Sequence, residues 1–285
     1  MREPQRDQLQ RGTSSPPFPK AEATVSRDDL VAAYGIAPFS EENFSKMLER
    51  ASYRDIVQVL SKSVARENLL GEGMNCHVFR IPGVQAYALR LPKRIARLEG
   101  RDSFSEVEDP FPDLNFGQPV GRFRNALIIK RAPGVSLSQF RDQEQRQIDC
   151  QKRFEELADL PDRSFQLFVA AVSALNAKNL LLDSLHSGNV LLDKSGLLLT
   201  PIDFEKRPEA GSLNSLSDVA NALFEVGTSF EPLSHMKFER SLVRQLLHKV
   251  IHASLTLGLP KANQNDRAFQ AICRQAGIDI TLLTA

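Results

Sequence analysis

"LLLDSLHSGNVLLDKSGLLLTPIDFE", residues 180–205, is the stretch that decides the fold we expect. It sets Asp183, Asn189 and Asp203 between apolar runs, and residues 189–201 have the pattern of a tight β-hairpin. Asp and Asn oxygens, together with phosphate oxygens, are the ligands that a hard divalent cation such as Mg²⁺ prefers. The stretch therefore predicts a phosphoryl-transfer site at the ends of a hairpin.

Composition narrows the class of protein around this stretch. The chain has 285 residues, of which 42% are hydrophobic and 25% are charged, which suits one large globular domain or two small ones. Lys and Arg (36) nearly balance Asp and Glu (35), so no global field favours nucleic acid or an anionic membrane. The sequence contains no run of about eighteen apolar residues, so it predicts no membrane-spanning helix. The three cysteines, Cys76, Cys150 and Cys273, are odd in number and widely spaced, which favours reduced, cytosolic chemistry over a disulfide framework.

The first 68 residues divide into two parts. Residues 1–25 are polar and rich in Ser, Pro, Gln and Arg, and we expect this leader to be disordered. Residues 26–68 have helical spacing and predict three short helices, the first two beginning at Ser26 and Ser40 as N-caps. This extension is either a packing element or a partner-binding module, and packing is the commoner role.

The order of the remaining elements predicts an α+β protein. Short strands are expected over residues 69–81, 84–92, 116–123 and 125–132, with an irregular segment at 94–109 that could hold a short helix. After residue 133 the pattern is mainly helical, with a strongly amphipathic helix over 164–179. Strands first and helices later, with no βαβ alternation, indicate two lobes rather than a doubly wound sheet.

The sequence of motifs resembles the protein kinase-like superfamily. In "GEGMNCHVF", Gly71 and Gly73 match a glycine loop that approaches the phosphates of ATP, although Cys76 stands where the third glycine would be. In "YALRLPK", Arg90 stands at the position of the family's phosphate-binding Lys, and Lys93 is the alternative, although further along a strand it would face differently. Arg keeps the positive charge but is longer and differs in geometry.

The resemblance extends through the rest of the small lobe. Glu106 and Glu108 in "FSEVED" are both candidates for the Glu that pairs with the phosphate-binding cation, and Glu106 is the preferred one. "NALIIKRAPGVSL" resembles the hinge, which implies that backbone groups from Lys130 to Ala132 face the adenine.

The catalytic loop departs from the family pattern. His186 and Asn189 fix a register in which Ser184 stands at the position of the catalytic Asp and Asp183 lies one residue early. A neutral Ser is a poor base, and losing a positioned base typically costs on the order of 10²–10⁴ in rate. Asp183 could replace it only if the loop were rearranged, since neighbouring side chains in extended chain point oppositely. Asp203 in "IDFE" matches the D-F-G Asp, and Asn189 matches the second Mg²⁺ ligand.

The resemblance implies a kinase-like N-lobe over residues 69–132 and a C-lobe over 133–285, with ATP and Mg²⁺ between them. Asp218 in "NSLSDV" matches the Asp that holds the catalytic loop, or is an N-capping carboxylate. Three functions stay open: an atypical serine/threonine kinase acting on a protein substrate, a pseudokinase that binds a protein partner, and a small-molecule phosphotransferase similar to aminoglycoside and choline kinases. We expect a monomer. The leader is similar to the type III export signals of bacterial effector kinases, which suggests secretion into a host cell.

Overall fold

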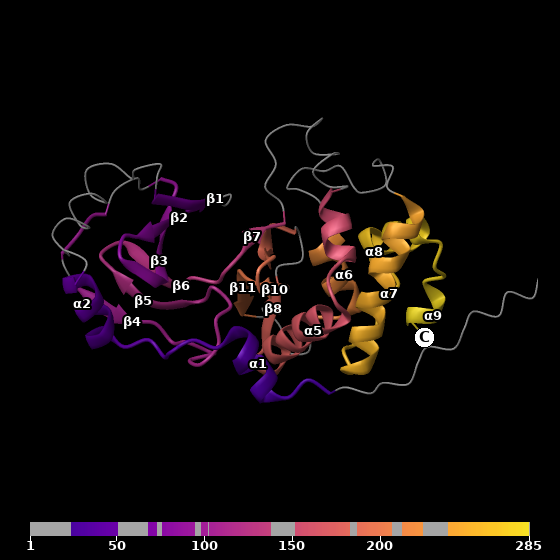
Figure 1. Cartoon of the computed structure of the whole chain (residues 1–285), viewed down its shortest axis with the longest axis horizontal. Coiled ribbons are helices and arrows are strands. Elements are labelled where there is room, and N and C mark those ends of the chain that lie inside the picture. The colour runs from indigo at the N-terminus through magenta and orange to yellow at the C-terminus, as the bar shows by residue number, and fades with distance from the viewer. Residues whose placement is uncertain are drawn as a thin grey trace, which may run out of the picture.

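The computed structural model describes residues 24–50, 68–72, 76–94, 98–101, 103–137, 152–182, 187–206, 213–224 and 239–284. It is a mixed α+β structure, as the sequence predicts. Figure 1 shows a six-stranded sheet at one end, most of the helices at the other, and short strands between them. The third helix predicted at the start of the chain, over residues 53–68, falls almost entirely outside the described residues.

The six-stranded sheet is antiparallel, with strand order β1-β2-β3-β6-β5-β4. Its strands are β1 (Leu69–Glu72), β2 (Cys76–Ile81), β3 (Val84–Pro92), β4 (Phe104–Glu106), β5 (Pro119–Phe123) and β6 (Ala126–Lys130). The prediction of a strand over 84–92 is confirmed residue for residue. The short helix expected within 94–109 is wrong for the described part of that stretch, which instead forms β4. The Phe104 ring stacks on Phe123 of β5, with 4.8 Å between centroids, and this contact favours the strand.

The two faces of this sheet differ in what they carry. Side chains alternate along β3, so Leu89 lies on one face and Arg90 on the other. The Leu89 face carries a buried cluster that includes Phe44 of α2 (Glu41–Arg50), whose ring meets Tyr87 edge-on at 5.7 Å. We call the opposite side the Arg90 face; it is the side from which Arg90 reaches Asp203.

The helical half has a separate and larger hydrophobic core. It is built around α5 (Asp162–Ala177), α6 (Leu216–Phe224), α7 (Arg240–Thr256) and α8 (Arg267–Ala276). The end of the chain adds α9 (Thr281–Thr284), and residues 152–158 form a further helix before α5. The amphipathic helix predicted over 164–179 is α5, which begins two residues earlier than the pattern indicates.

Two small sheets lie between the six-stranded sheet and the helices. In the first, β10 (Leu198–Pro201) pairs with β9 (Val190–Asp193), which pairs with β7 (Val135–Ser136). The predicted hairpin over 189–201 is therefore confirmed. In the second, β11 (Phe204–Lys206) pairs with β8 (Leu180–Leu182). The short 3₁₀ helix η2 (Ser187–Asn189) leads into β9.

The N-terminal segment joins the two halves. We call residues 26–44 the strap. Its first helix, α1 (Arg27–Tyr34), is capped by Ser26 as predicted, and its Tyr34 hydroxyl donates to the Leu199 carbonyl of β10 at 2.7 Å. Further along, the hydroxyl of Tyr87 on β3 reaches the Ala37 carbonyl at 3.5 Å. The strap thus contacts the helical core at one end and the sheet core at the other, which is the packing role that the sequence favours.

Candidate functional site

The centre of the candidate site is a pair of side chains from the two halves. Arg90 on β3 and Asp203 after β10 are 113 residues apart in the chain, yet Arg90 Nη1 lies 2.9 Å from Asp203 Oδ1 and Nη2 lies 3.4 Å from Oδ2. Their side chains are 31% and 47% exposed, so the pair is partly open to solvent and not enclosed in the protein core. Arg90 Nε also donates to Cys76 Sγ at 3.2 Å.

The positive charge of Arg90 is stabilised by its neighbours. Partial burial opposes the positive charge, but the carboxylate of Asp203, by its charge and its hydrogen bonds, outweighs burial and raises the pKa of Arg90. Two parallel N–H···O contacts between a guanidinium and a carboxylate fix both groups in direction as well as distance. Arg90 and Asp203 therefore form one unit in this conformation.

The backbone around Asp203 is also specific. Asp203 has φ of 57°, in the left-handed region that few residues other than glycine adopt and that Asp tolerates better than most. On one side the Ile202 N–H donates to the Asn189 carbonyl at 2.8 Å, and on the other Phe204 pairs with Leu182. The structure thus places Asn189 and Asp203 on adjoining backbone.

The glycine loop is described in part. Gly71 lies in β1 opposite Val78 of β2, and a Cβ added there would lie within 4 Å of no atom in the part of the chain that the structure describes. Open space at Gly71 leaves room for a ligand rather than reflecting a tight protein contact. Gly73 lies outside the described residues, and Cys76 is the first residue of β2.

Glu106 does not lie where the kinase resemblance puts it. It is exposed on β4, at the edge of the sheet, with β5 and β6 between it and β3. The register runs from Glu106 to Gly121, then to Ile128 and Leu89, so Glu106 belongs to the Leu89 face. Arg90 is on the other face, and Asp203 supplies its carboxylate partner instead.

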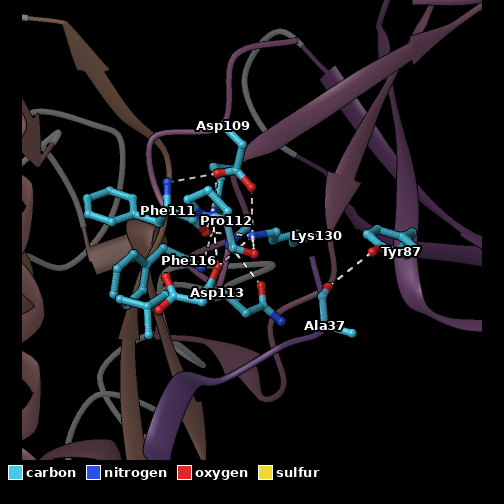
Figure 2. Close-up of polar contacts among 12 residues, drawn as sticks. Ala37, Tyr87, Asp109, Phe111, Pro112, Asp113, Phe116 and Lys130 are labelled. Atoms are coloured by element: carbon cyan, nitrogen blue, oxygen red, sulfur yellow. Dashed lines mark hydrogen bonds and ion pairs between the residues drawn. The ribbon is translucent and has the colours of Figure 1, made fainter. Parts of the chain in front are cut away.

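Lys130 has a structural role that its sequence position does not indicate. Its side chain is fully buried on the Leu89 face, since Lys130 pairs with Tyr87 across β6 and β3. Figure 2 shows its ammonium group enclosed by the turn at residues 109–114. The Nζ atom lies 2.7 Å from Asp109 Oδ2 and donates to the backbone carbonyls of Phe111 (2.7 Å), Pro112 (3.0 Å) and Leu114 (2.8 Å). Burial lowers the pKa of Lys130, and the hydrogen bond and charge of Asp109 oppose that shift.

After Lys130, one backbone N–H group is open to a hydrogen bond with an adenine ring. The Arg131 N–H donates to Ala86, and its carbonyl accepts from Asn115, so both groups are used within the protein. The N–H of Ala132 makes no hydrogen bond with any residue that the structure describes. The Pro-Gly turn then follows as expected: Gly134 has φ of 103°, and a Cβ there would lie 2.7 Å from the Leu192 backbone.

Asp183 and Ser184, which the resemblance places at the catalytic position, lie outside the described residues, but the strand that precedes them is held by hydrogen bonds. Asn214 is fully buried; its Oδ1 accepts from the Leu182 N–H at 2.6 Å, and its Nδ2 donates to the Leu180 carbonyl at 2.9 Å. Asn176 of α5 joins this network, with its Oδ1 2.7 Å from both the backbone N and the Nδ2 of Asn214. These two asparagines position the strand that enters the loop. The sequence analysis missed both, because a single Asn beside a helix start is an ordinary turn signal.

Asp218, the other candidate for holding the catalytic loop, caps a helix. Its Oδ2 accepts from the backbone N–H and the hydroxyl of Ser215, both at 2.7 Å, while the Ser215 hydroxyl accepts from the Asp218 N–H at 3.5 Å. This is a capping box at the start of α6. Of the two roles that the sequence left open for Asp218, the contacts of the described residues correspond to the N-cap.

The side chains of Asn189 and Asp203 do not fit Mg²⁺ as they are arranged. Both oxygens of Asp203 face the guanidinium of Arg90, and Asn189 is only 4% exposed. Within the described ranges, no three His, Cys, Asp or Glu side chains gather as a possible metal site. A hard cation would have to displace Arg90 to gain Asp203 as an unobstructed ligand.

No protein-family model matches this chain, and no curated protein matches it either. Among the helices of the described residues, none is both long and apolar enough to cross a lipid bilayer. The site therefore has to be interpreted from its own geometry.

Proposed function

We propose that this protein is a kinase-like nucleotide-binding protein with impaired phosphoryl transfer, that is, a pseudokinase that binds ATP between its sheet and its helical half. The observation that carries the proposal is the meeting of Arg90 and Asp203 across that junction. In the kinase-like superfamily, which the motif order resembles, the corresponding cation and Asp both face the phosphates.

Several features around the pair support nucleotide binding. The antiparallel sheet precedes a hinge-like turn, a β-hairpin and a set of helices, which is the order that the resemblance implies. Gly71 stands beside open space, and the N–H of Ala132 is available to donate to an acceptor nitrogen of the adenine edge. Arg90 can bind phosphate through its fork of N–H donors.

Impaired transfer follows from two substitutions. Ser184 replaces the expected base and is not ionised at neutral pH, so it cannot accept the proton of an attacking hydroxyl as a carboxylate does. Arg90 neutralises Asp203, the carboxylate that the family uses for metal. With both changes the site keeps phosphate contacts and loses chemistry, and we expect the biological role to depend on a bound protein partner.

A small-molecule phosphotransferase is less well supported. That function needs an acidic substrate pocket, and the helical half has a pocket of about 340 Å³ bordered by Asp218, Asp266 and Lys261. Both carboxylates there already cap helices: Asp218 bonds Ser215, and Asp266 bonds the Phe269 N–H at 3.0 Å. The Asp266 carboxylate also accepts from Asn221 at 2.7 Å. The pocket therefore offers little uncommitted negative charge.

Isothermal titration calorimetry of ATP into the wild type, Arg90→Ala and Arg122→Ala tests the proposal. Arg122 is exposed on β5 and lies on the Arg90 face, because it pairs with Leu127, which pairs with Arg90. Losing a charged hydrogen bond to phosphate costs roughly 1.5–3 kcal/mol, which corresponds to a roughly tenfold to 150-fold weaker Kd. We expect that loss for Arg90→Ala and none for Arg122→Ala.

The proposal fails if ATP does not bind the wild type, or if the two Arg variants bind it equally well. The impaired chemistry has its own check: a protein labelled from radioactive ATP by the wild type, but not by Asp203→Ala, would show an active kinase. Circular dichroism of each variant controls for misfolding.

A further inference from the structure

We infer that Arg90 takes the place of the divalent cation at Asp203, so that this site binds the polyphosphate of a nucleotide without a metal. The inference rests on the proposed function, since it concerns how the same site holds its ligand. It departs from the Mg²⁺ dependence that the kinase resemblance implies.

The first step is the geometry of the pair. Arg90 meets Asp203 with two N–H groups, one on each carboxylate oxygen, at 2.9 Å and 3.4 Å. A bidentate guanidinium–carboxylate pair places a full positive charge directly in front of the carboxylate. This is the region that a metal ion bound to Asp203 and bridging to phosphate would occupy.

The second step is what a metal would meet. A divalent cation on Asp203 would lie close to the guanidinium, and like charges at that separation repel each other. The other candidate ligand, Asn189, is only 4% exposed. Asp203 is 47% exposed, but both of its oxygens face the guanidinium, so neither residue offers Mg²⁺ an oxygen clear of a cation or of the protein interior. The metal would need Arg90 to leave.

The third step is that Arg90 need not leave to bind phosphate. A guanidinium has five N–H donors, and three of them are engaged: Nε with Cys76 and one N–H of each Nη with Asp203. Two N–H groups, one on each Nη, have no partner among the described residues. Arg90 can therefore hold Asp203 and donate to a phosphate oxygen at the same time. A Lys at this position has three N–H donors on a single nitrogen, so it could not form the two parallel contacts to the carboxylate and still keep two donors for phosphate.

Calorimetry of ATP with the full chain, in EDTA and in excess Mg²⁺, tests the inference. We compare the wild type with Arg90→Lys and with Arg122→Lys, the same substitution at an exposed position on the same face. The wild type and Arg122→Lys should bind ATP with Kd values that differ by less than about threefold between EDTA and Mg²⁺. Arg90→Lys should bind roughly tenfold more tightly with Mg²⁺ than with EDTA, because Asp203 then has an open oxygen.

The outcomes separate the two proposals. Wild-type binding that appears only with Mg²⁺ overturns the inference and leaves nucleotide binding in place. An absence of ATP binding in both buffers overturns the proposed function and the inference together. Equal wild-type binding in both buffers supports both. If circular dichroism shows that Arg90→Lys does not fold, the wild-type comparison alone decides, since it requires no variant.

Discussion

Replacing Lys130 by Met should destabilise the protein more than any other single charge removal on the sheet. Met has a similar length and no charge, so the substitution removes the ammonium while largely keeping the volume of the side chain. The change leaves Asp109, which is 13% exposed, without its cation, and it removes the Nζ donor from three backbone carbonyls. The carbonyls of Phe111 and Leu114 still accept from Gln118 Nε2. The effect should therefore come from lost polar contacts rather than from a cavity.

The magnitude follows from the burial of the pair. Removing one partner of a buried ion pair typically costs about 3–5 kcal/mol, because the remaining charge is left uncompensated. Burial lowers the pKa of Lys130, so desolvation already opposes the pair, and we expect the lower part of that range, about 3 kcal/mol. For a chain of this size that loss corresponds to a fall in Tm of roughly 6–12 °C.

Urea denaturation followed by circular dichroism measures this loss, with Lys194→Met as the matched control. Lys194 lies 2.6 Å from Glu156, but the two side chains are 60% and 28% exposed, and exposed pairs contribute about 0–1 kcal/mol. Equal stability of Lys130→Met and wild type, or an equal loss in both variants, would refute the reasoning that burial makes Lys130 important. Adding Asp109→Leu to Lys130→Met should recover part of the stability, since it removes the unpaired charge.

Three further predictions concern the elements that surround the site. Asn214→Ala should cost about 2–4 kcal/mol and speed hydrogen exchange at the Leu182 amide, because that N–H loses its buried acceptor; unchanged protection there would contradict the positioning role. Tyr34→Phe should lower stability by about 1–2 kcal/mol in thermal unfolding, since a buried carbonyl of β10 loses its donor, and a neutral result would mean that the strap does not depend on this bond. Hydrogen bonds from the backbone and hydroxyl of Ser26, together with Arg163, lower the pKa of Asp29 to about 2. The contribution of Asp29 to folding stability is therefore present above about pH 4 and is lost as the pH falls through 2. Ser26→Ala should raise the pKa of Asp29 in an NMR titration.

The sequence is a good guide to elements that local patterns determine. Alternation along 84–92 gives β3, Ser26 gives the start of α1, and the turn between apolar runs gives the β9–β10 hairpin. Each of these depends on residues that are close in the chain, where periodicity and capping act. The order of the motifs also identifies Arg90 and Asp203 as candidate site residues.

The sequence does not predict which side chains contact each other when they are far apart in the chain. Glu106 was assigned to Arg90, but the register of β4, β5 and β6 sends it to the opposite face, and register is a property of the whole sheet. Lys130 was considered for its backbone, whereas its side chain holds a turn that ends sixteen residues earlier in the chain, at Leu114. A buried Lys has no distinctive pattern in sequence, because charged residues are expected at the surface.

The departures from the kinase motifs agree with one another once the geometry is known. In the kinase-like superfamily, phosphoryl transfer uses a base for the acceptor and an Asp that holds metal, and losing either one slows the reaction. Under the proposed function, Ser184 stands where the base would be, and Arg90 pairs with the carboxylate that would hold metal. Two N–H groups of Arg90 have no partner among the described residues, so under the same proposal the pairing leaves donors for phosphate. On that proposal both changes weaken catalysis, and both are compatible with a nucleotide-stabilised binding surface.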